Sequence, residues 1–299
     1  MEKLKKSKFE KKSYFCKMKK KKSSTPKNNF RQTTIADSAL NTLYTQARQF
    51  LDAGHLPQAA HAIHRAAALA PKDPEISKLC KHINDKLYSY YSQLIRLHPN
   101  EPQHYLDRGE LYLRQGTVAK ALADYNRAIA LLTDTIQEHP RMKKPYFDRA
   151  YAYSTLELYT KAVDDYSTLL RLYPNDQPAR FNRAIAYYRM GQYPLAVDDL
   201  THCIHLAPNA ACYQFRAFAY FSQGLYIDAI DDFTRVLHLS PTLDNSEILY
   251  YRGLAFFHTG ALPQALDDLT QCLPNLADKD NRVNACLVID TCRTRLSHN

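Results

Sequence analysis

The sequence predicts an all-α protein built from stacked helical hairpins, and three features of its pattern predict this fold class. Apolar residues recur three and four positions apart through most of the chain, which is the period of an amphipathic helix. The apolar stretches repeat at a regular interval, so pairs of helices form a series of similar hairpins. Glycine, whose left-handed conformation can end a helix, closes five of the stretches: Gly54, Gly116, Gly191, Gly224 and Gly260.

Alignment on these glycines brings the other repeated positions into register. A small residue stands seven positions before each glycine: Ala47, Gly109, Ala184, Ala217 and Gly253. An aromatic residue stands four positions before it: Phe50, Tyr112, Tyr187, Tyr220 and Phe256. Alanine stands five positions after it: Ala59, Ala121, Ala196, Ala229 and Ala265. Small residues let two helices approach closely, and neighbouring hairpins must stack because one hairpin cannot bury its apolar faces alone.

A further copy of the pattern has Ala150, Tyr153 and Ala162 in register but carries Glu157 where the glycine would be. Proline ends four of the copies: Pro71, Pro174, Pro208 and Pro241. A small residue followed by Tyr, then Ala and a bulky residue, then Pro, over roughly 34 residues, resembles the tetratricopeptide repeat. The tryptophan of that family's consensus is absent, and its place is taken by residues such as Tyr105.

The resemblance implies a right-handed superhelical solenoid over residues 35–299. Its repeat units are expected near residues 40–73, 102–135, 143–176, 177–209, 210–243 and 246–279. A last helix over residues 280–297 is expected to cap the array with a polar outer face.

Two segments interrupt the regular stack. Residues 74–98 carry one continuous apolar stripe without a glycine turn, which predicts a single long helix or a degenerate unit whose turn is lost. Gly109 and Ala150 are 41 residues apart, an excess of about two helical turns. The helix that begins at Thr117 is therefore expected to continue to about Glu138.

Residues 1–34 differ from the rest of the chain in charge. Twelve lysines and Arg31 stand against only Glu2 and Glu10, whereas the net charge of the whole chain is +10. Such a segment cannot offset its own ordering entropy, so a disordered polybasic tail is expected. Its lysines suit the phosphates of nucleic acid, anionic lipid headgroups or an import receptor. The alternative is a solvated leader or a start-site extension upstream of Met18.

The composition also bears on the compartment. No run approaches the about 18 apolar residues of a membrane span, and the lysine-rich start lacks the apolar core of a secretory signal. The seven cysteines contain no Cys-x-x-Cys pair, and Cys203 and Cys272 occupy a slot where the repeat usually has alanine. A reduced, cytoplasmic location is expected, with a nuclear or membrane-peripheral one open through the basic tail.

Five units share a pair of opposite charges. Arginine precedes the small residue of the first helix: Arg108, Arg149, Arg183, Arg216 and Arg252. Aspartate precedes the bulky residue of the second helix: Asp124, Asp165, Asp199, Asp232 and Asp268. We interpret these as a structural ion-pair ladder, because ligand-binding residues would vary between units. Acidic doublets such as Asp198 and Asp199 do not predict a metal site, since adjacent helical residues point about 100° apart.

Catalytic motifs are missing from the chain. No two glycines lie within five residues of each other, so no phosphate-cradling loop is present, and neither Gly-x-Ser-x-Gly nor His-Glu-x-x-His occurs. His202 and His205, like His61 and His64, lack acidic or cysteine partners at metal-ligand spacing. We therefore predict no catalytic residue, no metal, no cofactor and no small-molecule substrate, and hence no enzyme.

In the family that the repeat resembles, ligands usually lie in the concave groove lined by the first helix of each hairpin. The residues expected there are unusually aromatic, and aromatic and arginine side chains are the commonest anchors of protein interfaces. The predicted peptide-binding residues are Phe147, Tyr151, Phe181, Asn182, Tyr188, Arg189, Phe218, Phe221, Tyr250 and Phe257. The expected neighbours of this strip are Leu106, Ile185 and Leu254, with Arg114, Lys144 and His258 at its border. The alternative is that some of these rings only pack against neighbouring helices.

Members of the family that act as chaperone partners hold an acidic C-terminal carboxylate through a set of Lys, Asn and Arg residues. Asn182 matches the middle asparagine of that set, but Phe147, Tyr151, Ala211 and Phe215 stand where the flanking residues would be. The sequence therefore predicts a different kind of adaptor, one that binds a peptide or partner helix of another protein in an aromatic groove. The alternative is a nucleic-acid-associated or anionic-membrane-associated assembly factor targeted by residues 1–34.

Overall fold

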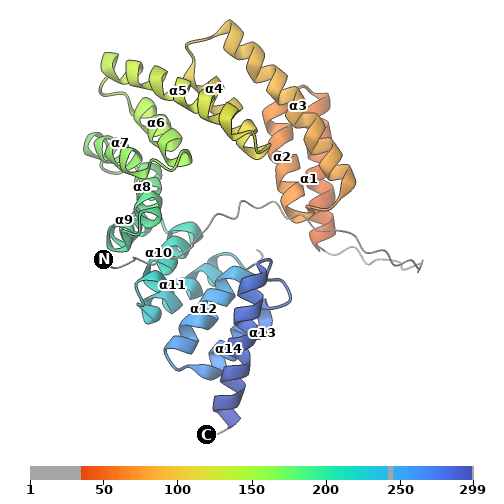
Figure 1. Ribbon diagram of the computed structural model, residues 1–299, viewed down its shortest axis with the longest axis vertical. Helices are drawn as coiled ribbons and strands as arrows, with labels where there is room; N and C mark the ends of the chain where they lie inside the picture. Colours follow the sequence, from red (N-terminus) through yellow and green to blue (C-terminus); the bar gives the residue numbers. More distant parts are fainter. Residues whose placement is uncertain (1–34, 242–244, 298–299) are drawn as a thin grey trace, which may run out of the picture. The chain divides into compact units, whose positions relative to one another are not determined.

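The computed structural model describes residues 35–241 and 245–297, and these residues form fourteen α-helices and no strand (Figure 1). The all-α fold class predicted from the sequence is therefore confirmed for the described residues. The prediction of a disordered tail at residues 1–34 lies outside them. The chain divides into two compact units, residues 1–80 and 81–299. None of the described helices is both long enough and apolar enough to cross a membrane.

The first unit contains one hairpin and the start of a long helix. The hairpin consists of α1 (Ile35–Asp52) and α2 (Leu56–Leu69), and the third helix, α3, is continuous over Pro74–Leu97. Buried residues from both arms pack inside the hairpin: Leu43, Ala47, Ala59 and Ile63. The positions of the repeat pattern thus form the core of this hairpin.

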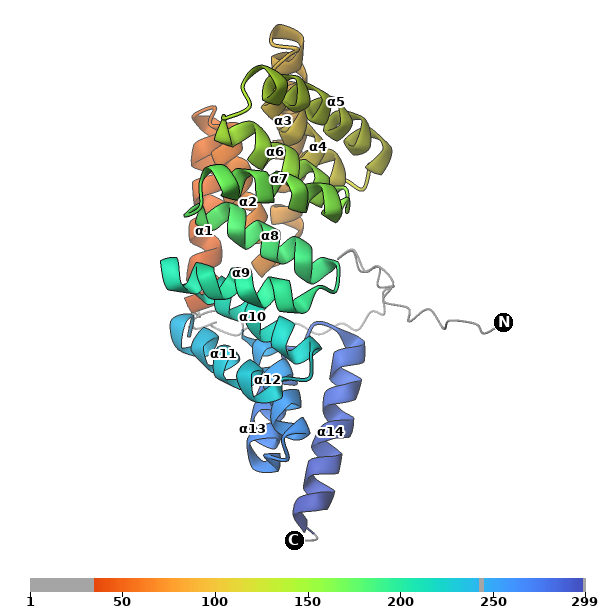
Figure 2. The same cartoon turned by 90° about the vertical axis from the view of Figure 1, so that its left-hand side faces the viewer.

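The second unit contains the rest of α3, five hairpins and a terminal helix. The first three hairpins are α4 (Pro102–Arg114) with α5 (Val118–Glu138), α6 (Lys143–Thr155) with α7 (Tyr159–Leu172), and α8 (Gln177–Arg189) with α9 (Tyr193–Leu206). They are followed by α10 (Ala210–Ser222) with α11 (Tyr226–Leu239), α12 (Ser246–His258) with α13 (Leu262–Cys272), and α14 (Lys279–Ser297). From α4 to α14 each helix packs on the next in chain order (Figure 2). This one-dimensional stacking is that of an α-solenoid.

A residue in the left-handed conformation ends the first helix of each hairpin. The turn glycines have φ between +73° and +82°: Gly54, Gly116, Gly191, Gly224 and Gly260. Glu157 adopts the same conformation, with φ of +59°, in the α6–α7 turn. There the Leu158 N–H donates to the Tyr153 carbonyl at 2.9 Å, as the Gln192 N–H does to Tyr187 in the α8–α9 turn. The turn geometry of the repeat therefore survives without its glycine.

The small repeat residues set how closely the two helices of a hairpin approach. Ala150, Ala184 and Ala217 are fully buried, and Cys203 and Cys272 fill buried positions of the second helices. Gly253 needs to be glycine, because a Cβ atom there would lie 2.8 Å from Cγ of Leu269. These crossings leave no room for larger side chains.

A ladder of arginine–aspartate pairs, which we call the guanidinium ladder, runs through the second unit. In each hairpin the arginine of the first helix donates two hydrogen bonds of 2.7–2.8 Å, from Nε and Nη2, to the aspartate of the second helix. The aspartates are nearly buried, with exposures of 1–6%. The carboxylate raises the pKa of the arginine, as Asp165 does for Arg149. The predicted ion-pair ladder is confirmed, and it lies inside the packing of the helices.

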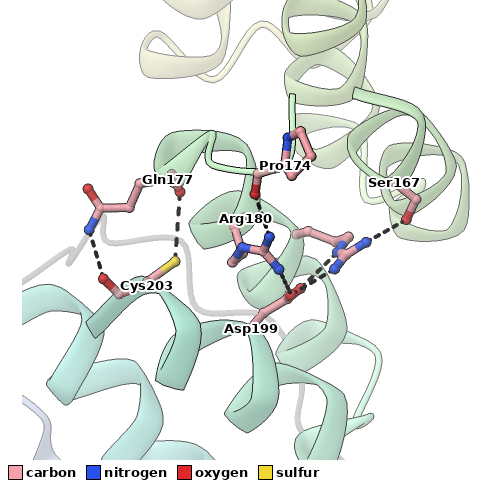
Figure 3. Close-up of polar contacts among 7 residues, drawn as sticks. Ser167, Pro174, Gln177, Arg180, Asp199 and Cys203 are labelled. Carbon is pink, nitrogen blue, oxygen red and sulfur yellow. Dashed lines mark hydrogen bonds and ion pairs between the residues drawn. The ribbon is translucent and has the colours of Figure 1, made fainter. Parts of the chain in front are cut away.

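The same guanidinium also bonds the preceding hairpin. Nη1 donates to a hydroxyl of the preceding second helix: Arg149 to Thr133 at 2.9 Å and Arg183 to Ser167 at 3.0 Å. Figure 3 shows the hairpin at Asp199, to which Arg180 also donates, at 3.4 Å. The ladder thus joins three helices at every step. Its first step reaches Ser92 of α3, so the second half of α3 acts as the second helix of a preceding unit.

The α5 helix extends to Glu138, as the spacing of the repeats predicts, and the ladder follows this extension. Ser167 and Thr201 stand two residues after their ladder aspartates, whereas Thr133 stands nine residues after Asp124. Because of this difference of about two helical turns, α6 packs nearer the C-terminal end of α5. Each later first helix packs nearer the start of the second helix that precedes it.

Glu157→Gly is expected to stabilise the protein by about 1 kcal/mol, because glycine adopts the left-handed conformation without the strain of a Cβ atom. Glu157→Ala keeps the Cβ atom and should change the stability by less than about 0.5 kcal/mol. Gly191→Ala should cost about 1 kcal/mol through backbone strain alone, since no other atom lies within 4 Å of the new Cβ. Thermal unfolding followed by circular dichroism measures all three, and a lower melting temperature for Glu157→Gly would contradict this account.

Arg149→Met is expected to destabilise the second unit by about 3 kcal/mol, because it leaves the nearly buried Asp165 carboxylate unpaired. The double change Arg149→Met with Asp165→Leu should recover most of that loss. Arg171→Met, at an exposed arginine of α7, is the matched control and should change stability by less than about 0.5 kcal/mol. Urea unfolding followed by circular dichroism measures the series. Equal stabilities for the single and double variants would show that the buried carboxylate is not the cause.

Candidate functional site

The predicted binding residues lie on the first helices of four consecutive hairpins. Phe147 and Tyr151 belong to α6, Phe218 and Phe221 to α10, and the others to α8 and α12. First helices of neighbouring hairpins contact each other: α6 with α8, α8 with α10, and α10 with α12. The arrangement therefore brings residues of four hairpins onto one side of the array.

Six rings on α8, α10 and α12, which we call the aromatic face, form two groups of three: Phe181 and Tyr188 with Phe215, and Phe218 and Phe221 with Tyr251. Phe215 links the two rings of α8, with centroid distances of 5.6 Å to Phe181 and 6.4 Å to Tyr188. Tyr251 lies 5.0 Å from Phe218 and 5.3 Å from Phe221. All four of these contacts are edge-on, and all six rings keep part of their surface in solvent. The face is therefore rigid and only half-buried.

The rings of α6 lie apart from the aromatic face. Phe147 packs edge-on against Tyr166 of its own hairpin, at 5.8 Å. Tyr151 is 42% exposed, and no ring contact joins it to Phe181 within the described part of the chain. These two residues stay predicted binding residues, but they are not part of the aromatic face.

The two predicted residues of α12 are directed toward the terminal helix. Tyr250 is only 4% exposed, and its hydroxyl accepts a hydrogen bond of 2.8 Å from Asn284 of α14. Phe257 lies beneath the guanidinium of Arg295, also of α14, at 5.3 Å. Tyr250 is thus a core residue beneath α14, and the expectation that it lines an open surface does not fit its burial. Repeat periodicity alone cannot show this, because α14 has no counterpart in the other units.

The polar border residues have partners within the chain. Lys144 forms an ion pair with Asp148 and donates to Gln103 at 3.0 Å, and Arg114 pairs with Glu110 at 2.6 Å. His258 stacks on Tyr226, with 4.4 Å between ring centroids. Asn182 is half-buried and Arg189 is exposed, both on α8. Leu106 and Leu254 are buried, so of the three apolar neighbours only Ile185 keeps contact with solvent.

Phe215 and Tyr251 complete the aromatic face, although sequence reasoning did not place them there. Both stand one residue before the ladder arginine of their unit. The same position holds Asp107, Asp148 and Asn182 in the preceding units. A change from polar to aromatic along this one position is the signal that could have found them.

Burial changes the acid–base behaviour of this region. Desolvation raises the pKa of Tyr251 to about 12 and also raises the pKa of Tyr188. The carboxyl pKa of Glu247, at the start of α12, is raised by desolvation as well. The charge of Glu247 contributes to the raised pKa of both tyrosines. Both phenols therefore stay neutral near pH 7 and can donate hydrogen bonds.

Within the described residues, no group of three or more His, Cys, Asp or Glu side chains is placed to hold a metal ion. The six cysteines among them are free thiols. The aromatic face offers stacking and apolar contact area, which suits binding.

Comparison with known proteins agrees with the fold. Models of the tetratricopeptide repeat match residues 89–134, 150–215 and 216–275, which together are more than half of the chain. No curated protein is significantly similar to the chain in sequence.

Solved structures of repeat proteins share this architecture. A tetratricopeptide repeat protein from Parabacteroides merdae is 21% identical, with a TM-score of 0.51 over 86% of this chain and 99% of its own. PilW, a type IV pilus biogenesis factor, is 16% identical, with a TM-score of 0.55 over 83% of this chain and 98% of its own. A chain of the APC/C hetero-tetramer Cut9–Hcn1 is 18% identical, with a TM-score of 0.52 over 83% of this chain and 48% of that one. At these identities the likeness shows the fold.

Proteins with these repeats generally mediate protein–protein interactions and are typically not enzymes, since stacked hairpins create an extended surface for a partner. The repeat pattern, the stacked hairpins, the family models and the solved structures agree. The chain belongs to the tetratricopeptide repeat family.

Proposed function

We propose that this protein is a non-enzymatic scaffold or adaptor that binds a peptide or a partner helix of another protein through the first helices of its second unit. The aromatic face is the observation that carries the proposal. Rings anchored by their neighbours but still partly in solvent are the usual energetic anchors of protein interfaces, because they bury a large area at little entropic cost. Five of the six rings also pack against buried core residues of the stack, so the same rings hold the helices and offer their outer surface to a partner.

The second helices of the same hairpins provide a comparison. The exposed large apolar residues of α9 and α11 are aliphatic, such as Leu195 at 49% and Ile227 at 70% exposure. Single exposed apolar residues are normal on protein surfaces, whereas contiguous ones mark interaction sites. The contrast favours the first-helix side as the binding side.

An adaptor of this kind would act in the cytoplasm, and residues 1–34 would supply any further targeting to the nucleus or to an anionic membrane. The alternative function, an assembly factor held on nucleic acid or lipid by that basic segment, draws on residues outside the described ones. No described residue favours it over the aromatic face. Binding driven by the basic segment would fall steeply with salt, whereas binding by apolar anchors would not.

Tyr188→Ala with Phe221→Ala is expected to weaken capture of the protein's partners at least about tenfold, because interface anchors each contribute about 2 kcal/mol. Leu195→Ala with Ile227→Ala, on the second helices, is the matched control and should capture the same partners as the unchanged protein. The measurement is affinity capture from the source cell with quantitative mass spectrometry. Circular dichroism melting verifies that both variants are folded.

A third arm removes residues 1–34. Partners lost only from this arm would support the alternative function. Equal capture by a folded Tyr188→Ala/Phe221→Ala variant and by the control would overturn the proposed binding side.

A further inference from the structure

The first hairpin carries a groove where the later hairpins carry a pair of the guanidinium ladder. The groove lies between α1 and α2, has a volume of about 370 Å³, and is lined in part by Leu43, Phe50 and Arg65. Gln46 and Ala62 also line it, and they stand where the later units have the ladder arginine and aspartate. The ladder therefore does not extend into this hairpin. We call this surface the end groove.

In the later hairpins a preceding second helix covers the corresponding face. In the α4–α5 hairpin, Arg108 stands in the place of Gln46 and donates a hydrogen bond of 3.3 Å to the Ser92 hydroxyl of α3. Tyr112 of the same hairpin donates one of 2.8 Å to the Tyr88 hydroxyl of α3. The covering helix thus supplies a large side chain and, four residues later, a hydroxyl. Among the described residues no helix precedes α1, so no preceding helix covers the end groove.

The last helix of the array has a surface that matches such a covering helix. The side of α14 that packs on α12 and α13 contains its buried residues: Ala285, Ile289 and Cys292. On the opposite side, Val283 and Leu287 are 53% and 62% exposed. Thr291 follows Leu287 by four residues, so a hydroxyl stands after a large side chain at the spacing found in α3. Gln46 of the end groove keeps an N–H donor for a hydroxyl of this kind.

The charges of these two surfaces are complementary. Arg65 of the end groove is exposed, and no acidic residue is among the described residues that line the groove. Asp290 stands seven residues after Val283, on the same side of α14, and its side chain is 75% exposed. Its ion pair with Arg293, at 3.8 Å, is an exposed one of the kind that contributes little. An arginine of another chain can therefore pair with this carboxylate.

We propose that the end groove binds the outer surface of α14 of a second copy of this chain. Leu287 of that copy packs on Phe50, which stands in the place of Tyr112, and Asp290 pairs with Arg65. The contact is head-to-tail, because it joins two different surfaces, and each copy keeps one of them for a further copy. The stacking of hairpins thus continues from chain to chain. This inference does not rest on the proposed function, since α8, α10 and α12 take no part in the contact.

The test is sedimentation velocity of the full-length protein over a series of concentrations. The mean mass of the unchanged protein should rise with concentration above that of one chain, 34.4 kDa. Two variants change exposed residues only: Gln46→Asp with Arg65→Asp in the groove, and Val283→Asp with Leu287→Asp on α14. Each should weaken self-association at least about tenfold, because it sets like charges against each other or a carboxylate in an apolar contact.

A mixture of the two variants distinguishes a head-to-tail contact from other modes of association. Each variant keeps the surface that the other has lost, so an equimolar mixture should form a complex of one copy of each and grow no further. Leu195→Asp with Ile227→Asp, on the second helices, is the matched control and should associate like the unchanged protein. Circular dichroism melting verifies that every variant is folded. If the groove variant is unfolded, Arg65→Asp alone replaces it.

Three results would overturn the inference. The first is a mass of one chain at every concentration. The second is self-association that the groove variant keeps and the α14 variant loses, since two α14 helices would then form the contact. The third is association that is lost only when residues 1–34 are removed. Tyr188→Ala with Phe221→Ala should leave self-association unchanged, so failure of this inference and failure of the proposed function are distinguishable.

Discussion

The guanidinium ladder is the interaction on which the rest of the second unit depends. Each ladder arginine bonds the aspartate of its own hairpin and a hydroxyl of the preceding one, so a single planar group fixes three helices. Apolar packing alone would hold these helices together without setting their rotation. On each first helix, the ladder arginine stands between residues that face the neighbouring first helices. The ladder therefore also fixes the positions of the rings of the aromatic face.

Periodicity is what made most of this fold predictable. The hairpins and the left-handed turns recur in all six units, and the arginine–aspartate pairs recur in five of them, so one alignment contains them. The third ladder partner does not follow from that alignment, because it belongs to the previous unit and lies at a different distance from its aspartate in α5. α14 has no counterpart in the repeat units, so its contacts are seen only in the three-dimensional structure.

The aromatic character of the candidate site was predictable from the sequence, but not all of the residues that form it were. Phe181, Tyr188, Phe218 and Phe221 were identifiable from the first-helix pattern. Phe215 and Tyr251 were hidden by a position that is polar in the earlier units, and Tyr250 was misplaced because Asn284 of α14 covers it.

The length of α5 has a consequence for how the array could have grown. From α6 to α13, hydroxyl, arginine and aspartate recur with nearly the same spacing, so a unit duplicated or deleted there regenerates all of its bonds. A crossover after α5 at the ordinary spacing would bring the next arginine to Asn126 instead of Thr133. A copy of the α4–α5 hairpin placed among the later units would therefore not reproduce their ladder spacing.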